Sequence, residues 1–259
     1  MNIRNVLLLS LLLPMVAACS KTETPVPAAT QDVATTPVTD AATAAPDAVA
    51  APATEPAAPN DNPIVAPTGP ALVPGTDYVD IQGGQPFEPL DGKIEVVEVF
   101  GYVCPACNAF QSSIRSWKAK LPADVRVTYV PAQFGPDWTP YAHAFYAAES
   151  LGLVDKTHEA VYDAIHTKHT LPGEGEKPTP APIAAFYAKY GVTAEQFTNA
   201  MNSFTVNGKL SKAKQFAVRS QISGTPSLIV DGKYLVKGRN WDDMLRIADQ
   251  LIAQERAAK

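Results

Sequence analysis

The stretch IEVVEVFGYVCPAC, residues 94–107, decides the fold of this chain. Its first seven residues form an apolar run of the kind found in buried strands, and it ends in two cysteines two residues apart. From the second cysteine onward, apolar residues recur at helical spacing, namely Cys107, Phe110, Ile114, Trp117 and Leu121. The sequence therefore predicts a strand that delivers Cys104 to the N-terminus of a helix.

This position suits Cys104 for redox chemistry. Unpaired backbone N–H groups and the helix dipole at a helix N-terminus stabilise a thiolate over a thiol. Pro105 falls in the first helical turn, where a missing N–H costs nothing. Cys104 and Cys107 are close enough in sequence to form a small disulfide ring that another thiol can reopen. A zinc site is the alternative, but it needs about four ligands, and the chain has no second cysteine pair.

The third cysteine, Cys19, ends an N-terminal targeting segment. Residues 6–13 are apolar but too few to span a bilayer, and VAAC at residues 16–19 is similar to the lipobox of bacterial lipoproteins. We therefore expect a signal peptide of residues 1–18 and a lipidated Cys19, with an ordinary secretory signal as the alternative. Ser20, by analogy with lipoprotein sorting, favours the outer membrane over the inner. Either signal sends the protein to an oxidising compartment, where a disulfide persists.

Residues 19–74 differ in composition from the rest of the chain. They are rich in Ala, Pro and Thr and contain no aromatic residue, which predicts a disordered tether. A proline segment that spans the cell wall or binds a partner is the alternative. Through residue 75, two basic and six acidic residues give −4 of the net −5, so the remainder carries about −1. That balance argues against nucleic-acid binding and against an anionic-membrane patch.

Residues 75–259 are expected to form one α/β domain. Strands are predicted at residues 77–81, 94–101, 125–130, 227–230 and 233–237, and helices at residues 140–151, 155–169, 181–190, 194–203 and 206–220, besides the helix after Cys104 and one capped by Asn240. The second and third strands should be parallel because a helix joins them. Asp231-Gly232 predicts a hairpin between the last two strands. Thr139-Pro140 predicts an N-cap followed by the first helical residue, and TAEQ at residues 193–196 resembles a capping box. The helices between residues 139 and 220 form an insertion.

This order of elements resembles a thioredoxin fold with a helical insertion, the plan of the DsbA family of periplasmic thiol oxidoreductases. The motifs that carry the resemblance are GTDY at residues 75–78, VVEVFGYVCPAC at 96–107, GTPSLIV at 224–230 and DGKY at 231–234. The resemblance extends over nearly all of residues 75–259. The resemblance implies a thioredoxin-like mixed sheet with an inserted all-helical domain. It further implies a monomer without cofactor or metal that introduces disulfide bonds into exported proteins and is reoxidised by a DsbB-type quinone-linked membrane oxidase.

The resemblance also implies roles for three further residues. Thr225-Pro226 stands where the family holds a cis-proline that faces the disulfide and presents backbone to a substrate peptide; a trans proline at the start of a strand is the alternative. Glu98 shares a strand face with Val96 and Phe100, which directs it towards the core beneath the cysteines. A buried carboxyl has a raised pKa and can exchange a proton with the resolving thiol. An exposed strand glutamate is the other interpretation.

Two residues depart from the strongest oxidants of the family. Ala106 stands where those proteins have histidine, so the Cys104 thiolate loses one stabilising group and the disulfide should be a weaker oxidant. Thr225 before the proline resembles isomerase and reductase relatives. The alternatives to an oxidase are thus a membrane-tethered reductase or isomerase, for example in cytochrome maturation, and a non-catalytic peptide-binding lipoprotein.

The remaining candidates have two interpretations each. His158, His166 and His169 fall near one another on a helical wheel, which fits either a metal site or a polar helix face. Trp138 either contacts substrate or packs in the core. Tyr102-Val103 either offers apolar surface beside Cys104 or ends the strand.

Overall fold

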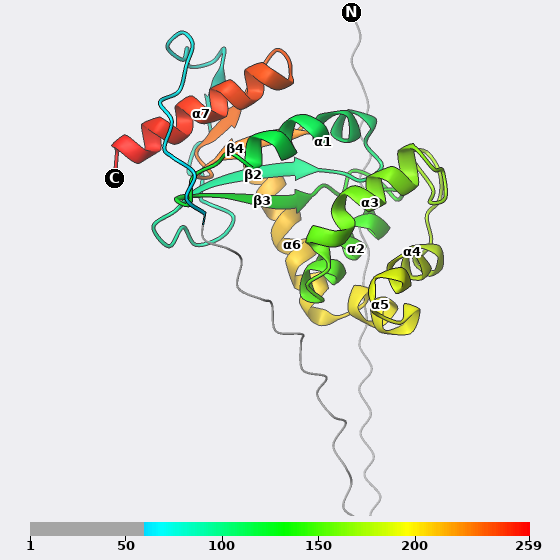
Figure 1. Cartoon of the computed structure of the whole chain (residues 1–259). Coiled ribbons are helices and arrows are strands. Elements are labelled where there is room, and N and C mark those ends of the chain that lie inside the picture. The colour runs from blue at the N-terminus through cyan, green and yellow to red at the C-terminus, as the bar shows by residue number, and fades with distance from the viewer. Residues whose placement is uncertain (1–59) are drawn as a thin grey trace, which may run out of the picture. The chain divides into compact units, whose positions relative to one another are not determined.

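The computed structural model of the protein describes residues 60–259, and its α/β architecture confirms the predicted fold class (Figure 1). The strands are β1 (Tyr78–Asp80), β2 (Ile94–Phe100), β3 (Val125–Pro131), β4 (Ser227–Val230) and β5 (Tyr234–Val236). The helices are α1 (Pro105–Lys118), α2 (Thr139–Ser150), α3 (Val154–His166), α4 (Pro180–Tyr187), α5 (Ala194–Met201), α6 (Phe204–Arg219) and α7 (Trp241–Ala257), with a 3-10 turn at Ala188–Tyr190. The predicted signal peptide, Cys19 and the tether up to residue 59 lie outside the described residues.

The five strands form one mixed sheet in the order β1-β5-β4-β2-β3. β2 and β3 are parallel, as predicted from the helix that joins them, and the other pairs are antiparallel. β2 is an interior strand, paired with β4 and β3, and is buried along its whole length, which explains its apolar run. In this register Glu98 lies beside Tyr129 of β3 and Leu228 of β4.

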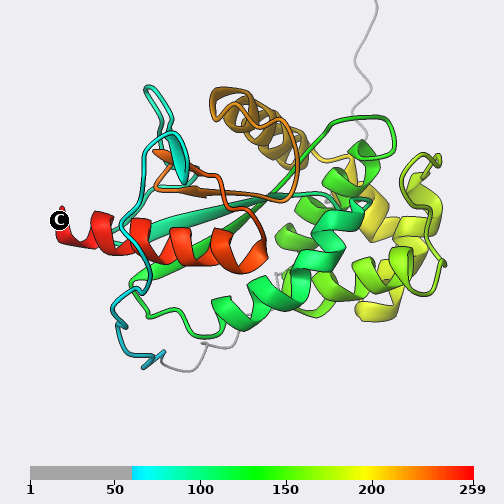
Figure 2. The ribbon, with the colours of Figure 1, turned by 90° about the horizontal axis from the view of Figure 1, so that it is seen from above.

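Helices cover both faces of the sheet. α1 and α7 lie side by side on one face, with α6 on the other (Figures 1 and 2). Val96 and Val230 pack in the cluster that contains the α1 and α7 residues, while Val97 and Ile229 belong to the cluster that contains Phe216 of α6. Successive strand residues point to opposite faces, so both faces of β2 are apolar because both are covered.

Of the helical insertion, α2 to α6, the helices α2 to α5 lie beyond the ends of β2 and β3 that lead towards the cysteines, and α6 returns along the face of the sheet (Figure 1). Thr193 forms the predicted capping box with Gln196 at the start of α5. The prediction that Thr139 caps α2 is wrong. Thr139 is already the first residue of that helix, and its hydroxyl donates a hydrogen bond to the carbonyl of Gly135 (3.0 Å).

The hairpin between β4 and β5 turns at Asp231-Gly232, as predicted. Both residues have positive φ angles, 47° and 67°, the conformation that makes Asp-Gly a preferred pair in hairpin turns. A side chain at Gly232 would meet the carbonyl oxygen of Gln85, because a Cβ there would lie 2.0 Å from it. Beyond β5, Asn240 caps α7, and its side-chain oxygen accepts a hydrogen bond from the Asp243 N–H at 2.9 Å.

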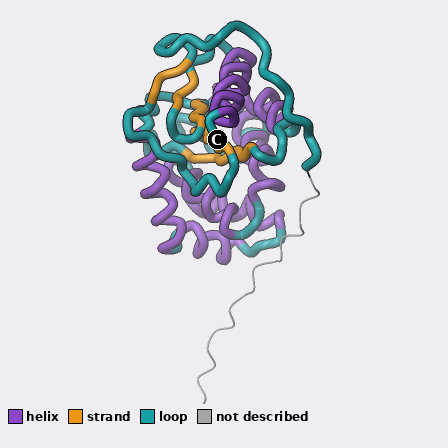
Figure 3. The backbone as a smooth tube through the Cα atoms, turned by 90° about the vertical axis from the view of Figure 1, so that its left-hand side faces the viewer, coloured by secondary structure: helices purple, strands orange, loops and turns teal. Residues whose placement is uncertain are grey.

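Residues 60–73, which the sequence predicts as part of the tether, lie against the domain. This segment contains neither helix nor strand (Figure 3) and crosses α7 (Figures 1 and 2). The Asn62 side chain donates a hydrogen bond to the carbonyl of Ala119 at 2.9 Å, and the Gln250 side chain donates to the carbonyls of Thr68 (2.9 Å) and Pro70 (3.0 Å). This strap, as we call residues 60–73, satisfies carbonyls at the C-terminal end of α1 that lack partners within the helix.

Within residues 60–259, no helix has both the length and the apolar character that crossing a bilayer requires.

Candidate active site

Cys104 is the N-cap of α1, as the sequence predicts. Its backbone is extended (φ −75°, ψ 116°), and its Sγ accepts a hydrogen bond from the Cys107 N–H at 3.2 Å. Pro105 stands in the first turn of the helix. Both cysteines are free thiols in this structure, Cys104 with 6% and Cys107 with 0% of its surface exposed. The local fold thus aims one sulfur at the helix N-terminus and buries the other.

The pKa values of the two thiols are shifted in opposite directions. A hydrogen bond from the Cys107 thiol, helped by the backbone N–H groups of Ala106 and Cys107, lowers the pKa of Cys104 to about 6 against the opposing effect of burial. Burial, and next the neighbouring Cys104 thiolate, raise the pKa of Cys107 far above its ordinary value. Cys104 is therefore the sulfur that is ionised at neutral pH, and Cys107 holds its proton.

The loop before β4 faces Cys104. The Thr225–Pro226 peptide bond is cis, as the resemblance implies. The Thr225 carbonyl oxygen lies 3.5 Å from Cys104 Sγ, and Thr225 and Pro226 are both half-buried. Backbone polar groups next to the reactive sulfur are therefore within reach of an incoming peptide.

Glu98 is fully buried, with 0% of its surface exposed, so the interpretation as an exposed strand residue is wrong. Neither of its carboxyl oxygens has a hydrogen-bond partner among the described residues. Burial raises the pKa of Glu98 to about 8; the charge of Lys118 opposes the rise and that of Cys104 adds to it. A carboxyl that titrates near neutral pH beside a thiol pair can give and take protons.

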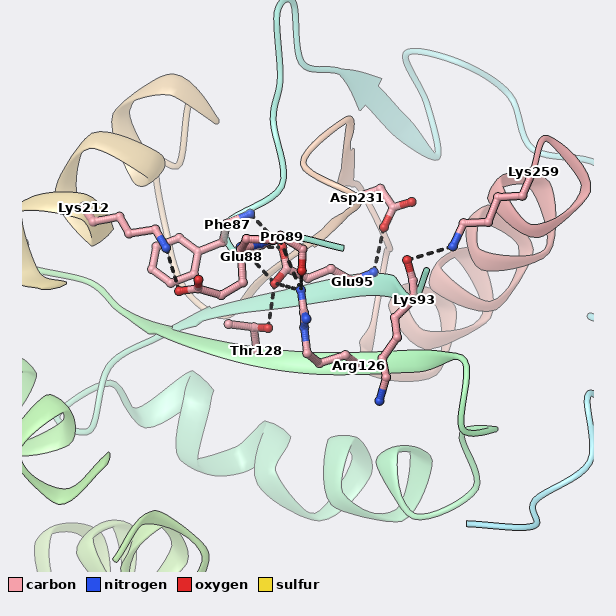
Figure 4. Close-up of polar contacts among 10 residues, drawn as sticks. All are labelled: Phe87, Glu88, Pro89, Lys93, Glu95, Arg126, Thr128, Lys212, Asp231 and Lys259. Carbon is pink, nitrogen blue, oxygen red and sulfur yellow. Dashed lines mark hydrogen bonds and ion pairs between the residues drawn. The ribbon is translucent and has the colours of Figure 1, made fainter. Parts of the chain in front are cut away.

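Glu95, three residues earlier on the same strand, is equally buried but fully bonded (Figure 4). Its carboxylate accepts hydrogen bonds from the Phe87 N–H (2.7 Å), from Thr128 Oγ1 (2.8 Å) and from Arg126 (3.0 Å). Its own N–H donates to the Asp231 carboxylate at 2.6 Å. Glu95 therefore ties β2 to β3 and to the β4–β5 hairpin, whereas Glu98 has no structural bond to keep.

Sequence reasoning missed a polar cluster under the active-site loop. His158 is buried, and its Nδ1 lies 3.0 Å from the Tyr102 hydroxyl; burial lowers the pKa of His158 to about 3. His166 Nε2 lies 2.7 Å from the Tyr102 carbonyl. Tyr102 and Val103 are themselves buried and offer no surface to a substrate. The available signal was the spacing of His158 with the apolar positions three, four and seven residues later in α3.

The other candidates have structural roles or none. Trp138 packs over Gly101, where a Cβ would come within 2.0 Å of its ring, so Trp138 belongs to the core. His169 lies beyond the end of α3, and the three histidines do not share one polar face. Among residues 60–259, no three His, Cys, Asp or Glu side chains are grouped as metal ligands.

The sequence and the fold are similar to those of known proteins. The family model described as the DSBA-like thioredoxin domain matches residues 95–249. The thiol:disulfide interchange protein DsbA of Pseudomonas aeruginosa is 40% identical over 187 residues, which cover 71% of this chain and 86% of that protein. DsbA of Azotobacter vinelandii is 41% identical over 189 residues, 71% of this chain and 85% of that protein. The crystal structure of the oxidoreductase DsbA from Xylella fastidiosa superposes with a TM-score of 0.69 at 44% identity, over 73% of this chain and 98% of that one.

Proposed function

The chain belongs to the DsbA-like thioredoxin family and is a thiol:disulfide oxidoreductase, and on this premise we propose that it oxidises exported proteins in the periplasm by passing on a Cys104–Cys107 disulfide. The observation that carries the proposal is the contrast between the two thiols: Cys104 caps a helix with its pKa lowered to about 6, and Cys107 lies beneath it with its pKa raised. A sulfur that is stable as a thiolate is a good leaving group, which favours transfer of the disulfide to substrate.

In the first step a substrate thiolate attacks Cys104 Sγ. The Cys104–Cys107 bond breaks, a mixed disulfide forms between substrate and Cys104, and the electron pair of the broken bond leaves with Cys107 Sγ. Cys107 requires a proton because burial raises its pKa. Glu98, protonated at neutral pH because burial raises its pKa to about 8, is the donor that we assign.

In the second step another thiolate of the substrate attacks the substrate sulfur of the mixed disulfide. The substrate gains its disulfide, and Cys104 leaves as a thiolate with the electron pair. The exchange moves two electrons from substrate to enzyme. The half-buried backbone of Thr225 and Pro226 lies beside the mixed disulfide and can hold the peptide while this step takes place.

The reduced enzyme needs an oxidant to work again. We assign this role to a DsbB-type membrane oxidase linked to quinone, which would take the two electrons from Cys104 and Cys107. The active enzyme is proposed to be a monomer that needs no cofactor of its own, because the two sulfurs carry both electrons.

Trapping experiments test the assignment of the sulfurs. Cys107→Ser should accumulate mixed disulfides with exported proteins. Cys104 still reacts in this variant, but Cys107 is no longer there to attack the mixed disulfide and release the substrate. Cys104→Ser is the matched variant and should trap few or none. Equal trapping by the two variants would contradict the assignment of Cys104 as the attacked sulfur and Cys107 as the resolving one.

The direction of transfer is tested by the redox state of the cysteine pair in cells. A donor of disulfides should be mostly oxidised and should become reduced when the quinone-linked oxidase is removed. A pair that stays reduced in the presence of the oxidase would instead point to the tethered reductase.

We also propose that the mature protein starts at a lipidated Cys19 and is held at a membrane, the outer membrane being favoured by Ser20. The support is the VAAC sequence at residues 16–19. Mass spectrometry of the mature N-terminus should find a lipid on Cys19, and Cys19→Ala should abolish processing as a lipoprotein. An unmodified N-terminus at another residue would refute the anchor.

A further inference from the structure

A small crevice opens between α1 and α3, next to the buried Glu98. It has a volume of about 100 Å³, and its walls include Gln111 and Lys118 of α1, Tyr129 of β3 and His158 of α3. Tyr129 is the residue that lies beside Glu98 across the β2–β3 ladder. Neighbouring strands are about 5 Å apart, so one wall of the crevice is the immediate neighbour of the Glu98 side chain.

Phe100, which neighbours Glu98 on the same face of β2, also contacts a residue of the crevice wall. Phe100, two residues along β2, shares a face with Glu98, and the His158 ring lies 5.0 Å from the Phe100 ring and 4.5 Å from the Tyr129 ring. Tyr129, Phe100 and His158 therefore form one packed group that joins the strand neighbours of Glu98 to the crevice wall.

Lys118 places a positive charge at the wall of the crevice. Its Nζ lies 4.8 Å from the centre of the Tyr129 ring, a cation–π contact. Lys118 forms no ion pair among the described residues, whereas Arg115, one turn earlier on α1, is paired with Glu159 at 2.5 Å. The Lys118 side chain is exposed at the mouth of the crevice.

The titratable groups around Glu98 and along the crevice come from three elements. They are Cys104 at the N-cap of α1 with Cys107, Arg115 and Lys118 of α1, Tyr129 of β3, and Asp155, His158, Glu159 and Tyr162 of α3. Arg115 and Glu159 neutralise each other, and His158 is uncharged because burial lowers its pKa to about 3. Lys118 is therefore the cation that remains available to the carboxylate.

We propose that Lys118 is a positioning residue for proton transfer: its ammonium group, held above the Tyr129 ring at the mouth of the crevice, is the counter-charge against which the buried Glu98 carboxyl ionises. This rests on the proposed function, in which Glu98 gives its proton to Cys107 Sγ. When the proton moves, the electron pair of the carboxyl O–H bond stays on Glu98, and Lys118 stabilises the carboxylate until a proton from solvent replaces it.

The test measures the titration of Glu98 itself in the oxidised protein, by the carbon-13 chemical shift of its carboxyl group against pH. Lys118→Met keeps the aliphatic stem and removes the charge, and it should raise the Glu98 midpoint by about one pH unit. Lys118→Arg keeps the charge and should leave the midpoint near that of the wild type. Lys120→Met is the matched control, an exposed lysine two residues away that does not line the crevice, and it should change nothing. A Lys118→Met midpoint equal to that of the wild type would overturn the proposal.

A second measurement separates this inference from the role of Glu98 in the exchange. The rate of a single turnover with a reduced peptide, followed against pH, should shift in Lys118→Met by the same amount as the Glu98 midpoint. If the midpoint moves and the rate profile does not, Lys118 is the counter-charge and the assignment of Glu98 as proton donor to Cys107 fails. If neither moves, the counter-charge itself is refuted.

Discussion

At the scale of single residues, Glu95 and Glu98 are equally buried but differ in their hydrogen-bond partners. Glu95 and Glu98 are both fully buried on β2. Glu95 has donors from the loop before β2 and from β3, whereas Glu98 has none among the described residues. A buried carboxyl without partners is costly as an anion and keeps its proton. Glu95 is therefore bonded into the structure on several sides, whereas the Glu98 carboxyl has no hydrogen bond to keep and a raised pKa.

The buried carboxyl makes the stability of the protein depend on pH. The folded pKa of Glu98, about 8, is above its ordinary 4.5, so the folded state binds the extra proton between these values. Its contribution to stability is complete below about pH 4.5 and is lost as the pH rises through about 8. For the oxidised protein we expect the free energy of unfolding to fall by about 3 kcal/mol from pH 5 to pH 8, and Glu98→Gln should remove this fall. Urea unfolding at several pH values measures both; parallel profiles for the two proteins would contradict the assignment.

Ala106 is expected to make the disulfide a weaker oxidant than a histidine at this position would. Its methyl group offers neither charge nor a hydrogen-bond donor, so the pKa of Cys104 is lowered by the Cys107 thiol and backbone N–H groups without help from a side chain of the intervening dipeptide. Ala106→His should lower the Cys104 pKa further and raise the reduction potential, because an imidazolium stabilises the thiolate of the reduced form.

Thiolate absorbance against pH and equilibration with glutathione measure the two quantities. Ala106→Gln, which adds a donor without the charge, is the control and should have a smaller effect. If neither quantity changes with histidine, groups outside the dipeptide set the redox potential.

At the scale of elements, α1 connects the chemistry with the strap. Its first turn holds Cys104, and carbonyls after its last turn accept hydrogen bonds from the strap. Asn60 donates to the carbonyl of Leu121 at 3.0 Å, and Gln250 of α7 holds the other end of the strap. The strap therefore joins the two helices that cover one face of the sheet.

The strap should be part of the protease-resistant domain. Limited proteolysis of the full chain is expected to leave a fragment that begins near residue 60 and not near residue 75, since hydrogen bonds hold residues 60–70 against α1 and α7. Each such bond contributes about 1 kcal/mol, so the pair of substitutions Asn62→Ala and Gln250→Ala should move the first cleavage towards residue 75. A wild-type fragment that begins near residue 75 would contradict the contact.

At the scale of the whole molecule, the helical insertion contacts the residues that precede Cys104. α3 reaches under the loop between β2 and α1, where His166 binds the Tyr102 carbonyl and His158 binds its hydroxyl. Trp138, at the entry to the insertion, covers Gly101 at the end of β2. Gly101 and Tyr102, which precede Cys104 in the chain, are thus held by the insertion, and the position of the Cys104 sulfur depends on both parts of the fold.

The reduced and oxidised forms should differ in how their stability responds to pH. Because the folded pKa of Cys104, about 6, is below its ordinary 9.0, the reduced form gains stability as the pH rises above about 6 and loses it as the pH falls through that value. The oxidised form has no thiol to titrate. From pH 5 to pH 8 we expect the reduced form to gain about 2 kcal/mol relative to the oxidised form. Urea unfolding of both forms measures the difference, and a difference that is constant over this range would refute a low Cys104 pKa.

The sequence alone was enough for the sheet, the helix order and the two reactive sulfurs, because each rests on a local pattern. An apolar run, a CPAC motif at a helix start and an Asp-Gly turn act over a few neighbouring residues, and β2, α1 and the hairpin follow them closely. The fold class and the family followed from the order of these patterns along the chain.

Only the tertiary structure decided which polar groups are paired, because their partners come from distant parts of the chain. Glu95 is bonded and Glu98 is not, yet both stand in the same apolar strand. His158 was expected on a metal site or a polar face and is buried against Tyr102, 56 residues away. The strap, by its composition, was assigned to the tether, and contacts with Gln250 about 180 residues away hold it to the domain. Burial and long-range contacts set these ionisation states and boundaries, and no pattern of neighbouring residues encodes them.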